Sequence, residues 1–181
     1  TTRLVGSEMC IRDRIVLVMI ISSKINSLSA SMASFLFFVY SAVTGVTLSA
    51  IFLMYTQESI ATTFGITAGT FGATALFGYV TKKDLSKMGS ILFMLLIGLI
   101  IASVVNMFLK NDTMMWILTY VGIVIFVGLT AYDMQKLKKI AHSIDDDESS
   151  IAKFAVLGAL TLYLDFINLF LRLLQIFGKK R

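Results

Sequence analysis

The sequence predicts an all-α protein that crosses a membrane several times. Hydrophobic residues make up 57% of the 181 residues and charged residues only 15%, and the chain contains no proline. Soluble domains average about 45–50% apolar and about 25% charged residues. The apolar residues gather into runs of about twenty, the length of helix that crosses a hydrocarbon core about 30 Å thick. We therefore expect a polytopic bundle of transmembrane helices.

Composition also argues against several kinds of function. The net charge of +5 comes from basic residues between the apolar runs and at both termini, where membrane topology places them, so no nucleic-acid partner is indicated. The single Cys10 cannot form an intrachain disulfide, and the single His142 does not allow a histidine-rich metal cage. No HExxH pattern, phosphate-binding glycine loop or serine with a matching histidine indicates an enzyme. We expect no enzymatic activity and no cofactor.

The chain begins with a segment that differs from the rest. Residues 1–14 show no apolar periodicity and resemble a translated sequencing adapter more than a signal peptide, so we expect an artefactual, non-native leader. The alternative is a short natural cytosolic tail. Residues 15–22 are apolar but too short to cross a membrane. We interpret them as the second half of a truncated helix rather than an interfacial segment, and residues 15–181 as a single transmembrane domain.

Five apolar runs long enough to cross the bilayer follow. The predicted spans are residues 33–55, 60–80, 89–109, 116–134 and 154–177. Basic and non-basic loops alternate between them, which places the basic loops in the cytoplasm under the positive-inside rule. The basic residues of these loops are Lys24, Lys82, Lys83, Lys87, Lys136, Lys138, Lys139 and Lys153. Three basic residues at the C-terminus break the alternation: either the last helix re-enters the membrane or, as we favour, they cap its C-terminal dipole.

Two further features predict how the helices start and pack. Asp84 is placed to cap the helix that follows it and to interact favourably with its dipole. Small residues at four-residue spacing predict close helix approach, because in lipid the packing of backbones supplies the association energy. These pairs are Gly45 and Ser49, Gly65 and Gly69, Ala68 and Gly72, and Ala155 and Ala159.

Asp165 is the residue for which a functional role is most strongly indicated. It lies near the middle of the apolar run 154–177, where an aspartate costs about 2.5–3.5 kcal/mol on insertion scales. Such a residue is expected to face the bundle interior and to have a partner. Asn168, one turn further, is a candidate hydrogen-bond donor. Arg172 is about 10 Å further along the helix and is expected to extend toward the interface.

Asp133 is the second carboxylate in an apolar span. One interpretation is an interfacial ion pair with Lys136, one turn on. The other is contact with Asp165 across the bundle: the two cannot then both remain ionised in a low dielectric, so they share a proton and titrate as a unit. When deprotonated, the pair offers oxygen ligands to a hard cation such as calcium. Residue counting places Asp133 nearer the cytoplasmic surface than Asp165, so contact requires helix tilt or an outward shift of the last helix.

The acidic run at residues 145–148 is the other candidate cation site. It lacks the spaced ligands and the central glycine of a calcium-binding loop. We interpret it as a solvated loop.

Several motifs resemble those of the Bax inhibitor-1 family of multipass membrane proteins. The segment 162–170 is similar to the last-helix signature of this family, and segment 128–133 to the motif that closes its penultimate helix. Segments 78–86 and 40–49 are similar to its middle-helix motifs. The resemblance covers residues 15–177, with the spans in the same order, and indicates a bacterial-type member that is truncated at its N-terminus.

This resemblance implies a fold of seven helices around a central last helix, of which about five and a half spans are present here. It implies a proton-sensitive calcium leak in a bacterial inner membrane, with Asp133 and Asp165 as the gating pair and as calcium ligands. It also implies a basic residue that engages the pair, for which Lys24 is the nearest match. Bacterial relatives are linked to a membrane-bound protease and eukaryotic ones to suppression of cell death.

Three functions follow as hypotheses. The leading one is a calcium leak gated by protonation of the Asp133–Asp165 pair. The rival is a non-conducting regulator that docks on a membrane protease or stress-response partner through its helices and the cytoplasmic loop 135–153. The third is a proton-coupled transporter, in which flux depends on a proton gradient.

Overall fold

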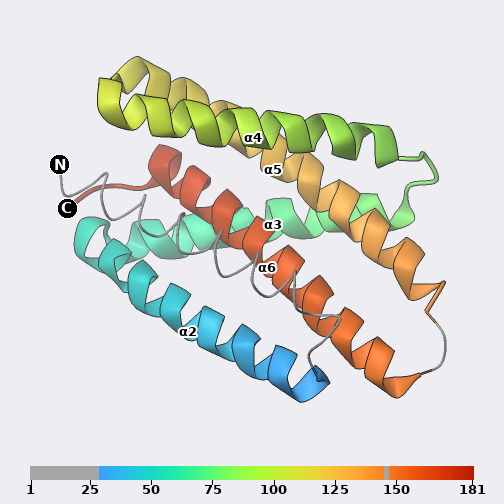
Figure 1. The fold of residues 1–181 in the computed structure, drawn as a ribbon. Helices are drawn as coiled ribbons and strands as arrows, with labels where there is room; N and C mark the ends of the chain where they lie inside the picture. Colours follow the sequence, from blue (N-terminus) through green and yellow to red (C-terminus); the bar gives the residue numbers. More distant parts are fainter. Residues whose placement is uncertain (1–28, 145–146) are drawn as a thin grey trace. The chain divides into compact units, whose positions relative to one another are not determined.

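The computed structural model describes residues 29–144 and 147–181, and the described chain is helical. Its elements are α2 (Ala30–Met54), α3 (Gln57–Val80), α4 (Ser86–Leu109), α5 (Asp112–Ala141) and α6 (Glu148–Phe177), shown in Figure 1. All five helices are long and apolar enough to cross a membrane, which confirms the predicted transmembrane helical fold. The predicted leader, the apolar segment 15–22 and Lys24 lie outside the described residues.

The C-terminal end of α5 and the N-terminal end of α6 are longer than the apolar pattern predicts. The pattern predicts that the fourth span ends at residue 134, whereas α5 continues to Ala141. It predicts that the last span begins at residue 154, whereas α6 begins at Glu148. The apolar pattern marks only the hydrophobic part of each helix, whereas backbone hydrogen bonding continues beyond it. Lys138 and Lys139 in the last turn of α5 also favour this extension, because positive charge stabilises the C-terminal end of a helix dipole.

Short polar side chains begin several helices. Thr56 accepts a hydrogen bond from the Ser59 N–H at 3.4 Å, and Asn111 accepts one from the Met114 N–H at 3.1 Å. Asp147 caps α6 by accepting from the Ser150 N–H and hydroxyl at 3.1 and 2.9 Å, and these hydrogen bonds hold the pKa of its carboxyl below the usual value. Each side chain satisfies an N–H that has no partner inside the helix.

Asp84 acts at the start of α4, one residue further from the helix than a standard N-cap. Leu85 occupies the cap position, and Asp84 Oδ1 accepts from the Ser86 N–H at 3.1 Å and from the Ser86 hydroxyl at 2.7 Å. The same oxygen forms an ion pair with Lys139 Nζ at 2.8 Å. The Lys139 ammonium, together with the Ser86 hydrogen bonds, holds the pKa of the Asp84 carboxyl far below its usual value. This capping residue therefore also ties α4 to the end of α5.

The chain divides into two compact parts. The first comprises described residues up to Met54 together with those from Ser143 to Leu160. In it, α2 is buried at Ala33, Tyr40 and Thr44, whose spacing of seven and four residues marks one face of a helix. The second part comprises residues 55–142 and 161–181, and it contains both candidate aspartates.

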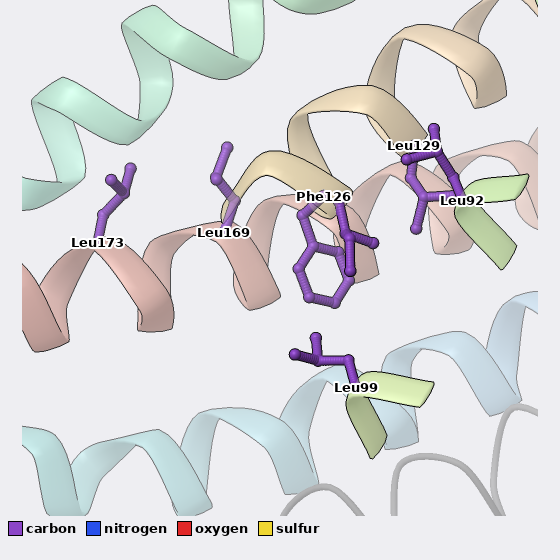
Figure 2. Close-up of a cluster of buried hydrophobic side chains, with 7 residues drawn as sticks. Leu92, Leu99, Phe126, Leu129, Leu169 and Leu173 are labelled. Carbon is purple, nitrogen blue, oxygen red and sulfur yellow. The ribbon is translucent and has the colours of Figure 1, made fainter. Parts of the chain in front are cut away.

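In the second part, α5 is the helix against which the others pack. It contacts both α3 and α4. Figure 2 shows the buried cluster that joins α4, α5 and the second half of α6. Its members are Leu92, Leu99, Ile125, Phe126, Leu129, Leu169 and Leu173.

Three glycines allow this close packing. A Cβ atom on Gly78 of α3 would overlap the Ala131 carbonyl oxygen of α5, and one on Gly89 of α4 would overlap the Tyr132 ring. Gly128 of α5 similarly makes room for Leu92. The packing glycines that the spacing predicts are different ones: at Gly65, Gly69 and Gly72, a Cβ atom would meet no atom of another described element within 4 Å. Spacing alone does not reveal which glycine faces a neighbouring backbone.

The C-terminal residues pair with the segment between α2 and α3. The Thr56 N–H donates to the Lys179 carbonyl oxygen at 3.1 Å, and the Lys179 N–H donates to Ser59 Oγ at 2.6 Å. Tyr55 and Lys180 form an antiparallel bridge. The last helix, α6, is continuous from Glu148 to Phe177. The basic C-terminus lies at the end of α3 opposite the lysine-rich loop.

The glycine contacts predict opposite effects of one substitution at two sites in α3. Gly78→Ala forces α3 away from the α5 backbone and should lower the free energy of unfolding by about 1–3 kcal/mol. Gly69→Ala, the matched control, meets no neighbour and should leave it unchanged or raise it by about 0.5–1 kcal/mol, because alanine favours helix. Thermal unfolding of the purified variants measures both. Equal effects at the two sites would contradict the packing described here.

Candidate ion-gating site

The second compact part brings Asp133 of α5 and Asp165 of α6 together. Their carboxyl groups are in side-chain hydrogen-bond contact. Asp165 is only 6% exposed, and its Oδ2 atom has no hydrogen-bond partner among the described residues. Two carboxyl groups that touch in an apolar environment form a hydrogen bond only when one of them carries a proton. The contact therefore favours the shared-proton interpretation of the pair over the interfacial one.

The extension of α5 explains why residue counting places Asp133 too near the surface. With the helix ending at Ala141, Asp133 is followed by eight helical residues, or about 12 Å of helix. A count that stops at residue 134, where the predicted span ends, leaves almost no helix after Asp133. Both aspartates are thus interior to their helices.

The α5 backbone next to Asp133 is packed against two other helices. Ala131 meets Gly78 of α3, and Tyr132 meets Gly89 of α4. Leu129 belongs to the buried cluster. Because the residues that precede Asp133 are packed against two helices, its Cα has little freedom to move.

Aromatic packing fixes the segment of α6 around Asp165. The Phe166 ring lies edge-on between Phe64 and Phe71 of α3, with ring centroids 5.4 Å from each. Ile167 and Leu169 are buried. Such edge-to-face contacts contribute about 0.5–1.5 kcal/mol each. Asp165 is therefore carried on a helix segment that α3 fixes from the other side.

The other partners that the sequence suggests, Lys136 for Asp133 and Asn168 for Asp165, are not paired with the aspartates in the described structure. Asp133 forms no ion pair with Lys136, since the only ion pair in the described ranges joins Lys139 and Asp84. The Asn168 side chain donates to the Leu164 carbonyl oxygen of its own helix at 2.8 Å, so its amide is directed along α6 and not to Asp165. In the described part of the chain, the partner of each aspartate is the other.

Arg172 packs across the helix interface rather than lying along its own helix. A Cβ atom on Gly122 of α5 would lie 3.1 Å from Arg172 Nε, so the glycine leaves the room that the arginine side chain occupies. One turn on, Gln175 accepts a hydrogen bond from the Thr119 hydroxyl at 2.8 Å. These contacts join the N-terminal half of α5 to the C-terminal end of α6, beyond the aspartate pair.

The pair does not by itself make a complete metal site. Among the described residues, no group of three or more histidine, cysteine or acidic side chains is placed to hold a metal ion. Two carboxylates offer at most four oxygens, whereas calcium takes six to eight ligands. The free Oδ2 of Asp165 is chemically suited to a hard cation. It would supply one ligand, and water or backbone oxygens would have to supply the others.

Sequence reasoning misses Gln135. It is 6% exposed, its Oε1 accepts from the Leu85 N–H at 2.9 Å, and its Nε2 donates to the Lys83 carbonyl oxygen at 2.7 Å. A glutamine near a helix end, among lysines, is normally solvated, so nothing in the sequence distinguishes it. The structure shows that it holds the loop between α3 and α4 in place.

Long apolar helices that bring two carboxyl groups into contact are typical of a polytopic membrane protein. The family model described as "Inhibitor of apoptosis-promoting Bax1" matches residues 7–181. The chain belongs to this Bax inhibitor family and is a multipass membrane protein.

Curated relatives cover most of the chain. The "Inner membrane protein YbhL" of Escherichia coli K12 is 57% identical over 169 residues, which is 93% of this chain and 72% of the relative. An uncharacterized protein of Borreliella burgdorferi is 52% identical over 91% of this chain and 71% of its own length. One from Rickettsia prowazekii is 49% identical over 82% of this chain and 63% of its own length.

The contact predicts that the two aspartates are energetically coupled. Asp133→Ala or Asp165→Ala alone leaves a carboxyl group in the span with no partner, whereas the double substitution removes both. The double variant should therefore be less destabilised than the sum of the single variants, by about 0.5–3 kcal/mol. A double-mutant cycle on unfolding in detergent or bilayer measures this coupling. Strict additivity would show that the carboxyl groups do not interact.

Proposed function

We propose that this protein lets calcium pass down its gradient across the bacterial inner membrane, through a pathway gated by Asp133 and Asp165. The observation that carries the proposal is the contact between the two carboxyl groups, one of which keeps a buried oxygen without a partner. Membership of the Bax inhibitor family supports it, because the motif resemblance around both aspartates implies this activity. The printed name of the E. coli relative supports the location.

Gating follows from the shared proton. In the hydrogen-bonded state the pair links α5 to α6 and carries one negative charge. A second proton removes the charge that attracts a cation, and loss of the last proton leaves two like charges in contact that repel. The pair therefore changes its charge and its hydrogen bond with pH, and each change alters how firmly α5 and α6 are joined at this point.

A conducting role fits the small number of ligands better than a storage role. A tight calcium site needs six to eight oxygens at fixed positions. Conduction instead requires an ion to bind well enough to enter and weakly enough to leave. Two carboxylates in the interior of a span meet that condition.

The rival function, a non-conducting regulator, requires a docking loop at residues 135–153. Most of this range is helix, since α5 ends at Ala141 and α6 begins at Glu148. Only residues 142–147 separate the two helices, so the connection that a partner could bind is short. The structure therefore supports docking through this loop less well than it supports the aspartate pair.

Calcium flux into proteoliposomes across pH 6 to 8 tests the proposal. The wild-type protein should show flux that changes with pH, and Asp133→Asn and Asp165→Asn should each lose that change, because neither variant can share a proton between two carboxyl groups. Asp112→Asn is the matched control: it removes a carboxylate from the first turn of α5, far from the pair, and should keep the pH response.

Two outcomes would contradict the proposal. One is wild-type protein that folds and conducts no calcium, which would favour the regulator. The other is an unchanged pH response in both pair variants. Flux that requires a proton gradient and is absent at equal pH on both sides would indicate proton-coupled transport instead.

A further inference from the structure

A second polar feature lies at the cytoplasmic end of α3 and α5, separate from the aspartate pair. A cavity of about 370 Å³ is lined by residues 81–84 of the loop between α3 and α4, by Gln135, Lys138 and Lys139 of α5, and by His142. All of these residues belong to the second compact part. The loops at this end of the helices are the basic ones, so the cavity faces the cytoplasm under the positive-inside rule.

The cavity is strongly positive. Four lysines and one carboxylate line it. The carboxylate is that of Asp84, and it forms an ion pair with Lys139 Nζ at 2.8 Å. Lys138 Nζ donates to the Tyr79 carbonyl oxygen at 2.8 Å and lies 4.6 Å from the centre of the Tyr79 ring. The ammonium groups of Lys82 and Lys83 have no ion-pair or hydrogen-bond partner in the described part of the chain. After internal pairing, the cavity keeps excess positive charge with unused donors.

The lysines are presented by a fixed frame rather than by a loose loop. Gln135 binds the loop at both the Lys83 carbonyl oxygen and the Leu85 N–H, at 2.7 and 2.9 Å. The Asp84–Lys139 ion pair fastens the same loop to α5. A preformed site loses less conformational entropy when a ligand binds than a flexible lysine-rich tail would.

The surface next to the cavity is apolar. The last turns of α3, which lead directly into Thr81, expose Leu76, Phe77 and Val80 at 63, 57 and 63%. Their spacing of three and four residues places them on one face of the helix. A ligand that bound in the cavity and extended toward the membrane would therefore meet lipid-facing side chains. This favours a membrane lipid over a free anion.

We propose that this cavity binds a phosphate group, supplied by the headgroup of an anionic phospholipid of the cytoplasmic leaflet. Lysine ammonium groups bind phosphate oxygens as point charges, and basic cavities between transmembrane helices on the cytoplasmic side suit such headgroups. The acyl chains lie along the exposed apolar face of α3. The bound lipid joins the α3–α4 loop to the end of α5, and this role is independent of calcium conduction.

Native mass spectrometry of the full chain, exchanged into equal amounts of phosphatidylglycerol and phosphatidylcholine, tests the site. The wild-type protein should retain phosphatidylglycerol preferentially. Lys82→Gln/Lys83→Gln should weaken that retention roughly 30-fold, at about fivefold per lysine. Both side chains are exposed, so the fold should be unaffected, and the thermal midpoint checks this.

Two further variants make the test specific. Lys87→Gln/Lys153→Gln removes the same charge from the same predicted side of the membrane but outside the cavity, and it should retain the preference. Asp84→Asn should tighten phosphatidylglycerol binding, because it removes the one carboxylate of the cavity and frees Lys139. Gln135 still holds the loop in this variant, and the asparagine side chain can still cap Ser86. A gain of binding cannot result from misfolding.

A comparison with a soluble phosphate distinguishes a bound lipid from a bound free anion. Glycerol phosphate added to protein in phosphatidylcholine nanodiscs should raise the thermal midpoint much less than incorporated phosphatidylglycerol does. The proposal is overturned if Lys82→Gln/Lys83→Gln keeps wild-type retention or if the Lys87/Lys153 control loses as much. Soluble glycerol phosphate that stabilises as well as the lipid, without preferential lipid retention, would also overturn it.

Discussion

A carboxyl group inside a membrane span needs a hydrogen-bonding partner, because the hydrocarbon around the bundle offers none. Asp165 meets this requirement through Asp133, an acid rather than a base. A cationic partner would fix the charge of the site over the physiological pH range, whereas a second acid makes that charge depend on a proton. The proposed gate depends on the partner of Asp165 being an acid. The rest of the second compact part holds α5 and α6 where the two carboxyl groups can meet.

The packing around the pair shows how the helices are held. Gly78 and Gly89 bring α3 and α4 close to α5 immediately before Asp133, and the Phe64, Phe166 and Phe71 rings join α3 to α6 beside Asp165. Gln135 and the Asp84–Lys139 ion pair hold the loop between α3 and α4 against α5. The result is a fixed scaffold around one small site whose charge can change.

The sequence predicts the helices well because lipid imposes a simple rule: an apolar run of about twenty residues must become a helix. It also indicates Asp165, because a charged residue in such a run is costly. It does not predict the end of α5 at Ala141, because residues 135–141 fall outside the apolar run. It also misplaces the packing glycines and misses Gln135, since both depend on which face of a helix meets a neighbour, and a lone sequence does not contain that information.

The proton shared by the two aspartates is best tested by infrared spectroscopy in lipid. A protonated carboxyl group has a C=O stretching band that shifts in D₂O, and no ionised carboxylate has this band. The wild-type protein at neutral pH should show one such band, and Asp165→Asn should lose it while Asp112→Asn keeps it. A wild-type spectrum at neutral pH with every carboxyl group ionised, or an identical band in Asp165→Asn, would contradict the account.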